Sequence, residues 1–430
     1  MKKILAFSAF GVMAALSFTQ ADEARTWTQA QGDKSIQGKL IKINGDTLEI
    51  VTNSNKIVKI KKSELSQKDQ DWVQDQGMKA ADKSTIKLEP SANQLNIVYF
   101  LGTDREPVEG YEKRLSDLMI YAQQFYGKEM LRNGFGPRSF GLSMKSPDTV
   151  NIIMYKAKGP ATDYPYENGG GFKASKEVNE YLDANGLRKS QHTLIIFPTF
   201  YDEKNTDMTP GGVPFYGLGK TCCALDYKFF DIAHLGEKSP KGNLLTKWYG
   251  GMIHELGHGL NLPHNHATAT DEKNLGTALM GAGNYTFGLQ PTFITPASCA
   301  ILDGCEVFST NPKQEFYKQQ PQLTVKPLNI TCTDKEITIK GDYKSDTVVK
   351  SINVFIEEPP FGVNRDYEAN TFTAKMDAKS KDFSFNIPMS EINGVKGNDF
   401  QVRLQFVFEN GQLIYKPFNF KKDDLKPINE

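Results

Sequence analysis

The segment that decides the fold and the chemistry of this 430-residue chain is His-Glu-Leu-Gly-His-Gly-Leu-Asn-Leu-Pro-His, residues 254–264. On a helix, residues four apart lie on one face about one turn apart, so His254 and His258 can present ring nitrogens to one ion. Two imidazoles from one turn supply half of a tetrahedral zinc site. Glu255 follows the first ligand, which places its carboxylate beside the ion, where it can accept a proton from the metal-bound water.

The residues after His258 predict a turn that supplies a third ligand. Asn261 tolerates the left-handed conformation found at helix ends, and Pro263 cannot continue a helix. A chain that leaves the helix there can bring His264 back toward the first two histidines. Three nitrogen ligands leave the fourth zinc position open for water and substrate, which is typical of a catalytic site. We therefore expect one catalytic Zn2+ ion bound by His254, His258 and His264.

Chance is a poor explanation of this cluster, because four of the six histidines, at positions 254, 258, 264 and 266, fall within 13 residues. Other third ligands stay open at this point. His266 could bind in a different loop path, or a downstream acid such as Glu272 or Glu306 would make a glutamate-type zinc peptidase. A further alternative is a helix whose histidines are merely polar or buried and bind no metal.

An alternating pattern of strands and helices precedes this segment. Apolar runs predict strands at 95–101, 150–155, 193–200 and 223–230, and apolar residues at helical spacing predict helices at 111–131 and 173–184. Asn243 is expected to cap a helix that runs from Leu244 to about Leu260 and carries the histidines. Beyond it, Thr295 is expected to cap a further helix that Pro296 opens.

The eleven residues 254–264 resemble the motif of the metzincin zinc peptidases, except that Asn261 stands where glycine is usual. Metzincins also have a methionine-containing turn beneath the metal, and Met280 lies 16 residues after His264. The order of strands and helices is similar too, so the resemblance covers about residues 94–312.

This resemblance implies roles for individual residues. It makes the three histidines the zinc ligands and Glu255 the base, with Met280 packed under the site. Some metzincins have a tyrosine two residues after this methionine, where Ala282 stands here, so Tyr285 is the candidate for stabilising the transition state. The strand within 217–230 has the position at which family members bind peptide by adding it to a sheet edge.

The first residues predict export. Lys2 and Lys3 precede an apolar run, and Thr19-Gln20-Ala21 fits a cleavage site after Ala21, so residues 1–21 read as a signal peptide. No later stretch is long and apolar enough to span a bilayer, and we expect a secreted, periplasmic or cell-surface protein without a transmembrane anchor.

The chain has five cysteines: Cys222, Cys223, Cys299, Cys305 and Cys332. Export makes one or two disulfides an option, and the odd number of cysteines leaves at least one thiol unpaired. The first two cysteines are adjacent, so on a strand they would face opposite ways.

Residues 22–77 read as a small β-rich module. Asn44-Gly45-Asp46 joins two apolar runs, which is a strong hairpin signal. With the segments around Trp27 and Leu65, the module resembles a small SH3-like barrel, first named as a homology region of a yeast actin-patch protein. Such a module implies an interaction domain, a spacer or a propeptide. Residues 78–93 read as a polar linker.

Residues 322–430 carry short apolar runs bounded by turn residues, and Asn410-Gly411 joins the last two. This pattern predicts a small antiparallel β-sandwich of the immunoglobulin or fibronectin kind. The expected fold class is therefore multidomain α+β. It comprises an N-terminal SH3-like β-barrel, a metzincin-like α/β catalytic domain at 94–321 and a C-terminal β-sandwich.

Charge and motif together predict the function. The 51 basic residues balance the 51 acidic ones, which disfavours nucleic acid as the main partner. We expect an exported zinc-dependent metalloendopeptidase that hydrolyses peptide bonds of extracellular or periplasmic proteins, using a zinc-activated water with Glu255 as general base. The two flanking β modules would contact a surface or a protein partner. The alternative is an exported adhesion or binding protein with a non-catalytic zinc-peptidase-like scaffold.

Overall fold

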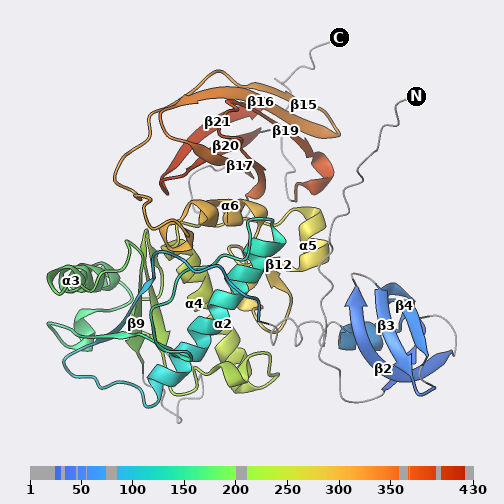
Figure 1. Cartoon of the computed structure of the whole chain (residues 1–430), viewed down its shortest axis with the longest axis horizontal. Coiled ribbons are helices and arrows are strands. Elements are labelled where there is room, and N and C mark those ends of the chain that lie inside the picture. Colours follow the sequence, from blue (N-terminus) through green and yellow to red (C-terminus); the bar gives the residue numbers. More distant parts are fainter. Residues whose placement is uncertain are drawn as a thin grey trace, which may run out of the picture. The chain divides into compact units, whose positions relative to one another are not determined.

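The computed structural model describes residues 25–30, 34–44, 47–54, 56–73, 85–199, 211–357, 367, 369–393 and 399–421. The chain divides into two compact units, Met1–Thr85 and Ile86–Glu430, which Figure 1 colours along the sequence. The expected signal peptide lies outside the described residues. Within those residues, no helix combines the length and the apolar character needed to cross a membrane.

The first unit contains a four-stranded antiparallel sheet with a small core. Its strands pair in chain order: β1 (Arg25–Thr28), β2 (Ser35–Asn44), β3 (Thr47–Thr52) and β4 (Ile57–Lys61). Alternate residues of β3 are buried, and Leu48 and Ile50 pack with Trp27. The 3-10 turn η1 (Lys62–Glu64) and a helical stretch at 67–73 follow.

The expectation of a barrel in the first unit stays a prediction. The predicted hairpin is present as β2 and β3, although Gly45 and Asp46 at its tip lie outside the described residues. β1 and β4 are the two ends of the strand order and do not pair with each other in the part of this unit that is described. Beyond the ends of these strands, an antiparallel bridge joins Gln29 to Leu65, and the N–H of Ser66 donates to the carbonyl of Thr28 at 2.8 Å.

The second unit begins with a five-stranded sheet in the order β10-β11-β9-β5-β8. The strands are β5 (Asn96–Leu101), β8 (Ile153–Lys156), β9 (Thr193–Pro198), β10 (Gly217–Leu218) and β11 (Thr221–Asp226). All pairs are parallel except that of β10, an antiparallel strand at the edge. β5, β9 and β11 are buried along their whole length, as expected when both faces of a parallel sheet are covered.

Three helices cover this sheet. α2 (Tyr111–Arg132) and α4 (Pro240–Gly259) pack on one face, and α3 (Gly170–Ala184) packs on the other (Figure 1). Cys222 and Cys223 belong to these two different cores, as predicted from the alternation of a strand. All five cysteines are buried free thiols, so the structure contains none of the disulfides that export made an option.

Of the two predicted helix caps, one is wrong and one is confirmed. α4 is capped by Ser239 and not by Asn243: the Ser239 hydroxyl oxygen accepts the Gly242 N–H at 3.1 Å, and Pro240 takes the first helical position. The prediction was wrong because a proline at the first position needs no N–H partner and lets the helix start earlier. α6 (Pro296–Gly304) begins as predicted, with the Thr295 side chain as its cap.

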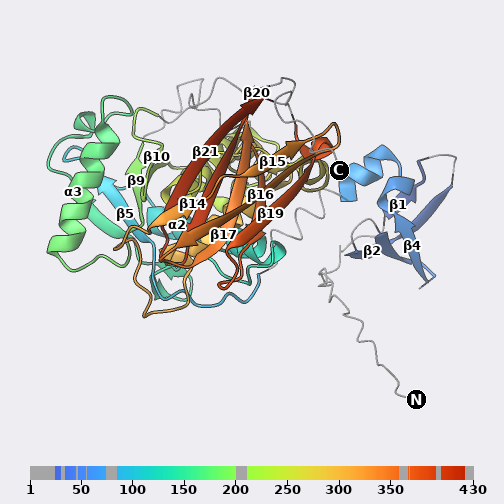
Figure 2. The ribbon, with the colours of Figure 1, turned by 90° about the horizontal axis from the view of Figure 1, so that it is seen from above.

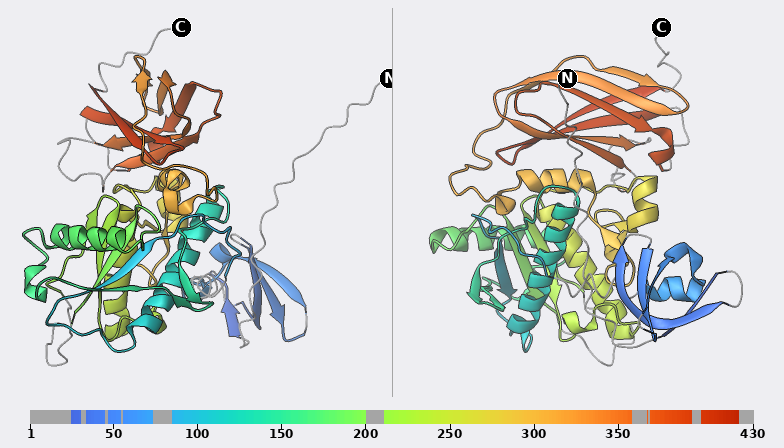
Figure 3. Two further views of the ribbon diagram at one scale, coloured as in Figure 1. Left: turned by 60° about the vertical axis from the view of Figure 1, so that its left-hand side comes forward. Right: turned by 45° about the vertical axis from the view of Figure 1, so that its right-hand side comes forward.

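The C-terminal part of this unit is built from two four-stranded sheets. One contains β14 (Leu323–Val325), β15 (Asn329–Cys332), β16 (Glu336–Ser345) and β19 (Asp382–Pro388), and the other contains β17 (Val349–Glu357), β18 (Asn370–Lys375), β20 (Asp399–Phe408) and β21 (Leu413–Lys421). Residues such as Ile339 and Leu404 from the two sheets share one core, and the strands run in similar directions (Figure 2). The sheets stack over α6 (Figure 3). The predicted Asn410-Gly411 turn joins β20 and β21.

Short elements complete the second unit. They are β6 (Met144–Ser146), β7 (Thr149–Val150), η2 (Ala161–Asp163), η3 (Ile232–His234), α5 (Ala269–Leu275), β12 (Thr277–Ala278), η4 (Gly283–Tyr285), β13 (Thr292–Phe293), η5 (Glu306–Phe308) and η7 (Met389–Glu391).

Candidate metal centre and cleft

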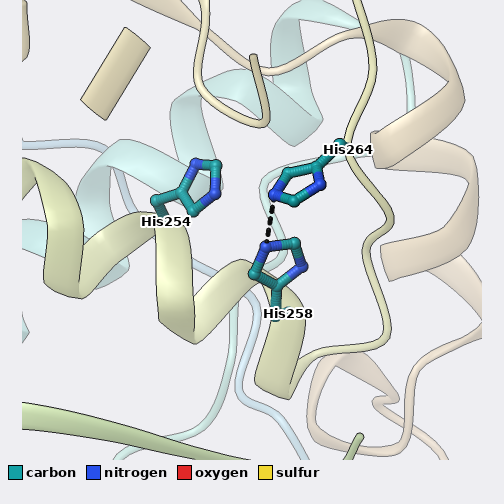
Figure 4. A group of neighbouring side chains, drawn as sticks. All are labelled: His254, His258 and His264. Carbon is teal, nitrogen blue, oxygen red and sulfur yellow. Dashed lines mark hydrogen bonds between the residues drawn. The ribbon is translucent and has the colours of Figure 1, made fainter. Parts of the chain in front are cut away.

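The three candidate ligands converge on one point (Figure 4). His254 and His258 lie one turn apart on α4, and His264 comes from the segment that follows the helix. One ring nitrogen from each lies within 4.8 Å of the other two, and the Nε2 atoms of His258 and His264 are 2.9 Å apart. A tetrahedral zinc site with bonds of about 2.0–2.1 Å places its ligand atoms roughly 3.3 Å apart. The His258–His264 pair is close to this spacing, and the three histidines form a group that could hold a metal ion.

A helix-end turn brings the third histidine to the other two. Asn261 has φ 71°, the left-handed conformation predicted for it. Its N–H donates to the carbonyl of His258 and the N–H of Leu262 donates to that of Gly257, each at 2.9 Å. This pair of bonds is the Schellman pattern that closes a helix. The chain therefore reverses direction before His264.

Backbone carbonyls orient the first two rings. Nδ1 of His254 donates to the carbonyl of Leu279 at 2.7 Å, and Nδ1 of His258 donates to that of Leu262 at 2.8 Å. Because a carbonyl only accepts, Nδ1 carries the proton and the lone pair of Nε2 is left for an ion. Burial, with smaller effects of His258 and His264, lowers the pKa of His254 to about 3, so this ring stays neutral. Neutral, oriented imidazoles fit the zinc ion that the sequence predicts.

Glu255 lies beside the cluster and outside it. This half-buried residue lines the same cleft as His258 and His264. Burial raises the pKa of Glu255 to about 7, while a hydrogen bond from the backbone of Gly217 acts to lower it. Gly217 belongs to β10, and a Cβ at this position would lie 2.3 Å from the Cβ of His258. Only glycine lets the sheet edge come this close to the ligands and the carboxylate.

Met280 packs against α4, the helix that carries His254 and His258. It is 1 % exposed, and a Cβ added to Gly257 would lie 2.5 Å from its Sδ atom. Its neighbour Leu279 supplies the carbonyl that orients His254, and the Met280 carbonyl accepts the N–H of Asn265 at 3.2 Å. The residues around Met280 thus support both α4 and the loop that carries the third candidate ligand, His264.

The alternative third ligands have other partners. The His266 ring bonds to the carbonyl of the next residue at 2.8 Å. Oε2 of Glu272 accepts a hydrogen bond from the Asn393 side chain at 2.9 Å, and Oε2 of Glu306 accepts the N–H of Gln191 at 2.8 Å. Among the residues with described positions, it is His264 that joins the two histidines of α4.

A cleft of about 700 Å³ opens at the cluster. Its walls come from α4 and the turn after it, from β10 and the residues beside it, from β21, and from single residues before α3 and between β17 and β18. They comprise Tyr166, Phe215, Tyr216, Gly217, Gly219, Glu255, His258, Asn261, Leu262, Pro263, His264, Tyr367, Leu413 and Tyr415. Leu413 and Tyr415 lie on β21, so the C-terminal part builds one wall of the cleft.

Tyr367 is the cleft residue that sequence reasoning missed. Its ring stacks on that of His264, with centroids 3.6 Å apart and planes at 22°. Burial, and then the charge of Glu255, raises the pKa of Tyr367, which keeps its hydroxyl protonated. No spacing rule links it to the histidines, because it lies far downstream in the chain. Tyr285, the candidate from sequence, is 70 % exposed and is not among the described residues that line the cleft.

Comparison with known proteins identifies solved structures that are similar to most of this chain. No family model and no curated protein matches the chain. The solved structure of wild-type OgpA from Akkermansia muciniphila is 58 % identical, with a TM-score of 0.78, over 80 % of this chain and 98 % of that one. Catalytically inactive OgpA from the same organism, in complex with an O-glycopeptide (glycodrosocin) substrate, is 57 % identical with the same TM-score and coverage.

This similarity corrects the two resemblances drawn from sequence motifs. The comparisons support neither a metzincin assignment nor an SH3-like one. They show instead a likeness to OgpA that extends over nearly all of that protein. The motif residues 254–264 define a local geometry, and a local geometry does not by itself define a family. The chain belongs to the same family as OgpA of Akkermansia muciniphila.

Proposed function

We propose that this protein is a zinc-dependent peptidase that cleaves O-glycosylated peptides. The observation that carries the proposal is the convergence of three histidines beside Glu255 at an open cleft. The substrate class rests on the O-glycopeptide in the complex of OgpA, to which this chain is 57 % identical. In this proposal His254, His258 and His264 hold one zinc ion, which supplies a Lewis acid that polarises a carbonyl and makes water more acidic.

Glu255 is the group placed to move the proton. Its carboxylate lines the cleft next to two of the ligands, and it is not part of the cluster itself. From there it can take a proton from the attacking water and later deliver it to the leaving amine. The Gly217 N–H holds the carboxylate against the edge strand, on the side from which a peptide would approach.

The edge strand β10 is the proposed binding site for the peptide backbone. It ends the strand order of the five-stranded sheet as far as the chain is described, so one of its sides is open for pairing. Gly217 and Gly219 line the cleft, and their lack of side chains lets another backbone come close. An extended peptide can therefore add to this edge through main-chain hydrogen bonds.

The tyrosines that line the cleft are side chains able to bind a sugar. A tyrosine presents an apolar ring face together with a polar hydroxyl, and sugars likewise combine apolar faces with hydroxyl groups. The hydroxyl of Tyr216 accepts the N–H of Gly171 at 3.0 Å, and that of Tyr415 accepts a hydrogen bond from Gln405 at 2.6 Å, so both rings are held in place. The cleft volume of about 700 Å³ lies within the range of roughly 300–1,000 Å³ typical of ligand sites.

Two peptides that differ only in an O-linked glycan on one threonine test this function. We expect about one zinc per chain by elemental analysis, cleavage of the glycosylated peptide alone, loss of cleavage with a chelator and recovery with added zinc. Equal cleavage of both peptides would contradict the glycan requirement. Undiminished cleavage by the metal-free protein would contradict the zinc requirement.

Binding without cleavage is the outcome that would favour a different function. If the zinc-loaded chain holds the glycopeptide but leaves it intact, the non-catalytic scaffold becomes the better description. Export, expected from residues 1–21, is a separate proposal. N-terminal sequencing of the mature protein tests it, with residue 22 as the expected first residue.

A further inference from the structure

Tyr317 adopts a backbone conformation that bulky residues avoid. Its φ is 60°, in the left-handed region, which is disfavoured for a side chain of this size. Such an outlier persists only where the surroundings hold it. The N–H of Tyr317 donates to the carbonyl of Asn410 at 2.9 Å, and Nε2 of Gln412 donates to the carbonyl of Tyr317 at 3.3 Å. Both partners lie in the turn between β20 and β21, so this C-terminal hairpin sets the backbone of Tyr317.

The hydroxyl of Tyr317 joins three separate segments. It accepts hydrogen bonds from Nδ2 of Asn261 at 3.2 Å and from the N–H of Glu306 at 3.3 Å, and it lies 2.8 Å from Nε2 of His192. Nδ1 of His192 donates to the carbonyl of Gly259 at 2.7 Å. Nε2 is therefore the acceptor of the neutral ring, and the Tyr317 hydroxyl at 2.8 Å is a closer donor to it than the Cys305 thiol, whose Sγ lies 3.5 Å away. Burial lowers the pKa of His192 to about 4, which keeps the ring neutral.

Two of these hydrogen bonds, to Gly259 and Asn261, reach the segment that carries the proposed metal ligands. Gly259 is the last residue of α4 and directly follows His258. Asn261 is the left-handed residue of the turn, and the next carbonyl, that of Leu262, orients the His258 ring at 2.8 Å. A movement of this turn would displace that carbonyl and the chain that leads to His264.

We propose that Tyr317 is a positioning residue that couples the β20–β21 hairpin to the metal centre. The inference rests on the proposed zinc site and adds a residue that touches neither the ion nor the substrate. Without the hydroxyl, the amide of Asn261, the N–H of Glu306 and Nε2 of His192 all lose their common partner. Groups that hold metal ligands in place commonly change metal affinity by about 10- to 100-fold. We expect Tyr317→Phe to weaken zinc binding by about tenfold.

Competition with a chromogenic chelator measures the zinc Kd of the full chain and its variants. Tyr317→Phe and Asn261→Gly are made separately and together. Glycine retains the left-handed turn at position 261 and removes only the side-chain donor. Because both substitutions delete the same hydrogen bond, their effects on the zinc Kd should be far from additive.

Tyr99→Phe is the matched control. Tyr99 is fully buried, and its hydroxyl donates to Asp226 at 2.8 Å and accepts the N–H of Val108 at 3.2 Å. Loss of this hydroxyl should lower the melting temperature without changing the zinc Kd. The comparison separates a general loss of stability from a specific effect on the ligand turn.

The outcomes are distinct. A zinc Kd about tenfold weaker for Tyr317→Phe, unchanged for Tyr99→Phe and non-additive with Asn261→Gly supports the inference. An unchanged Kd for Tyr317→Phe overturns it, and so do additive effects. If Tyr317→Phe fails to fold, Asn261→Gly decides: a weaker Kd supports the coupling and an unchanged one overturns it. No zinc binding by the unmodified chain would refute the zinc site itself, which is a separate result.

Discussion

Replacing Glu255 by glutamine tests the chemistry of the cleft most directly. The amide has nearly the same shape and can still accept the hydrogen bond of the Gly217 backbone, but it cannot take up a proton. Among the described residues that line the cleft, Glu255 is the only carboxylic acid, so no neighbour there can take over its role. General acid–base catalysis contributes typically about 10²- to 10⁴-fold. With no substitute base, we expect the fall in kcat/KM to approach about 10⁴-fold, or about 5.4 kcal/mol in activation free energy.

The assay compares kcat/KM for a cleaved O-glycopeptide in the two proteins, together with zinc content and glycopeptide affinity. Zinc content should not change, because the cluster consists of three histidines. Glycopeptide affinity should change little, because the substitution keeps the shape of the cleft. A variant that binds zinc and retains more than about a tenth of the activity would refute the general-base role. Loss of zinc together with activity would show that the carboxylate belongs to the ligand set.

Substitutions at four further positions probe the candidate ligands and the scaffold. His264→Ala should lower zinc affinity well over tenfold, whereas His266→Ala should leave it unchanged; the reverse result in chelator competition would exchange their roles. Tyr367→Phe should keep the ring stacked on His264 and leave the free energy of unfolding unchanged. Tyr367→Ala removes the ring and should lower the free energy of unfolding by about 0.5–1.5 kcal/mol, measured with denaturant. Equal stability of the two variants would argue against the stacking. Arg114→Met breaks the buried ion pair in which Nη1 of Arg114 lies 2.6 Å from Oδ1 of Asp226. It should lower the free energy of unfolding by about 3–5 kcal/mol in the same assay. A change below about 1 kcal/mol would mean that the pair does not hold α2 to the sheet.

Local interactions explain which parts of the fold could be predicted. The left-handed Asn261 and the cap at Thr295 were predicted correctly, because each depends on atoms only a few residues away. The start of α4 was misplaced because Ser239 and Asn243 can both cap a helix and the proline between them decides. The family assignment failed for a related reason, since a motif of eleven residues samples too little of the chain to identify its relatives.

The sequence by itself determined which side chains can carry the chemistry. Two histidines four residues apart on a helix must share one face, whatever the rest of the chain does. Only the tertiary structure decided what surrounds them. The carbonyl of Leu279 orients His254. Tyr367 and Tyr415 from the C-terminal part line the cleft, and the turn between β20 and β21 holds the backbone of Tyr317. These contacts join residues that are far apart in the chain. No periodicity or spacing encodes them, because they form only when distant segments of the chain pack together.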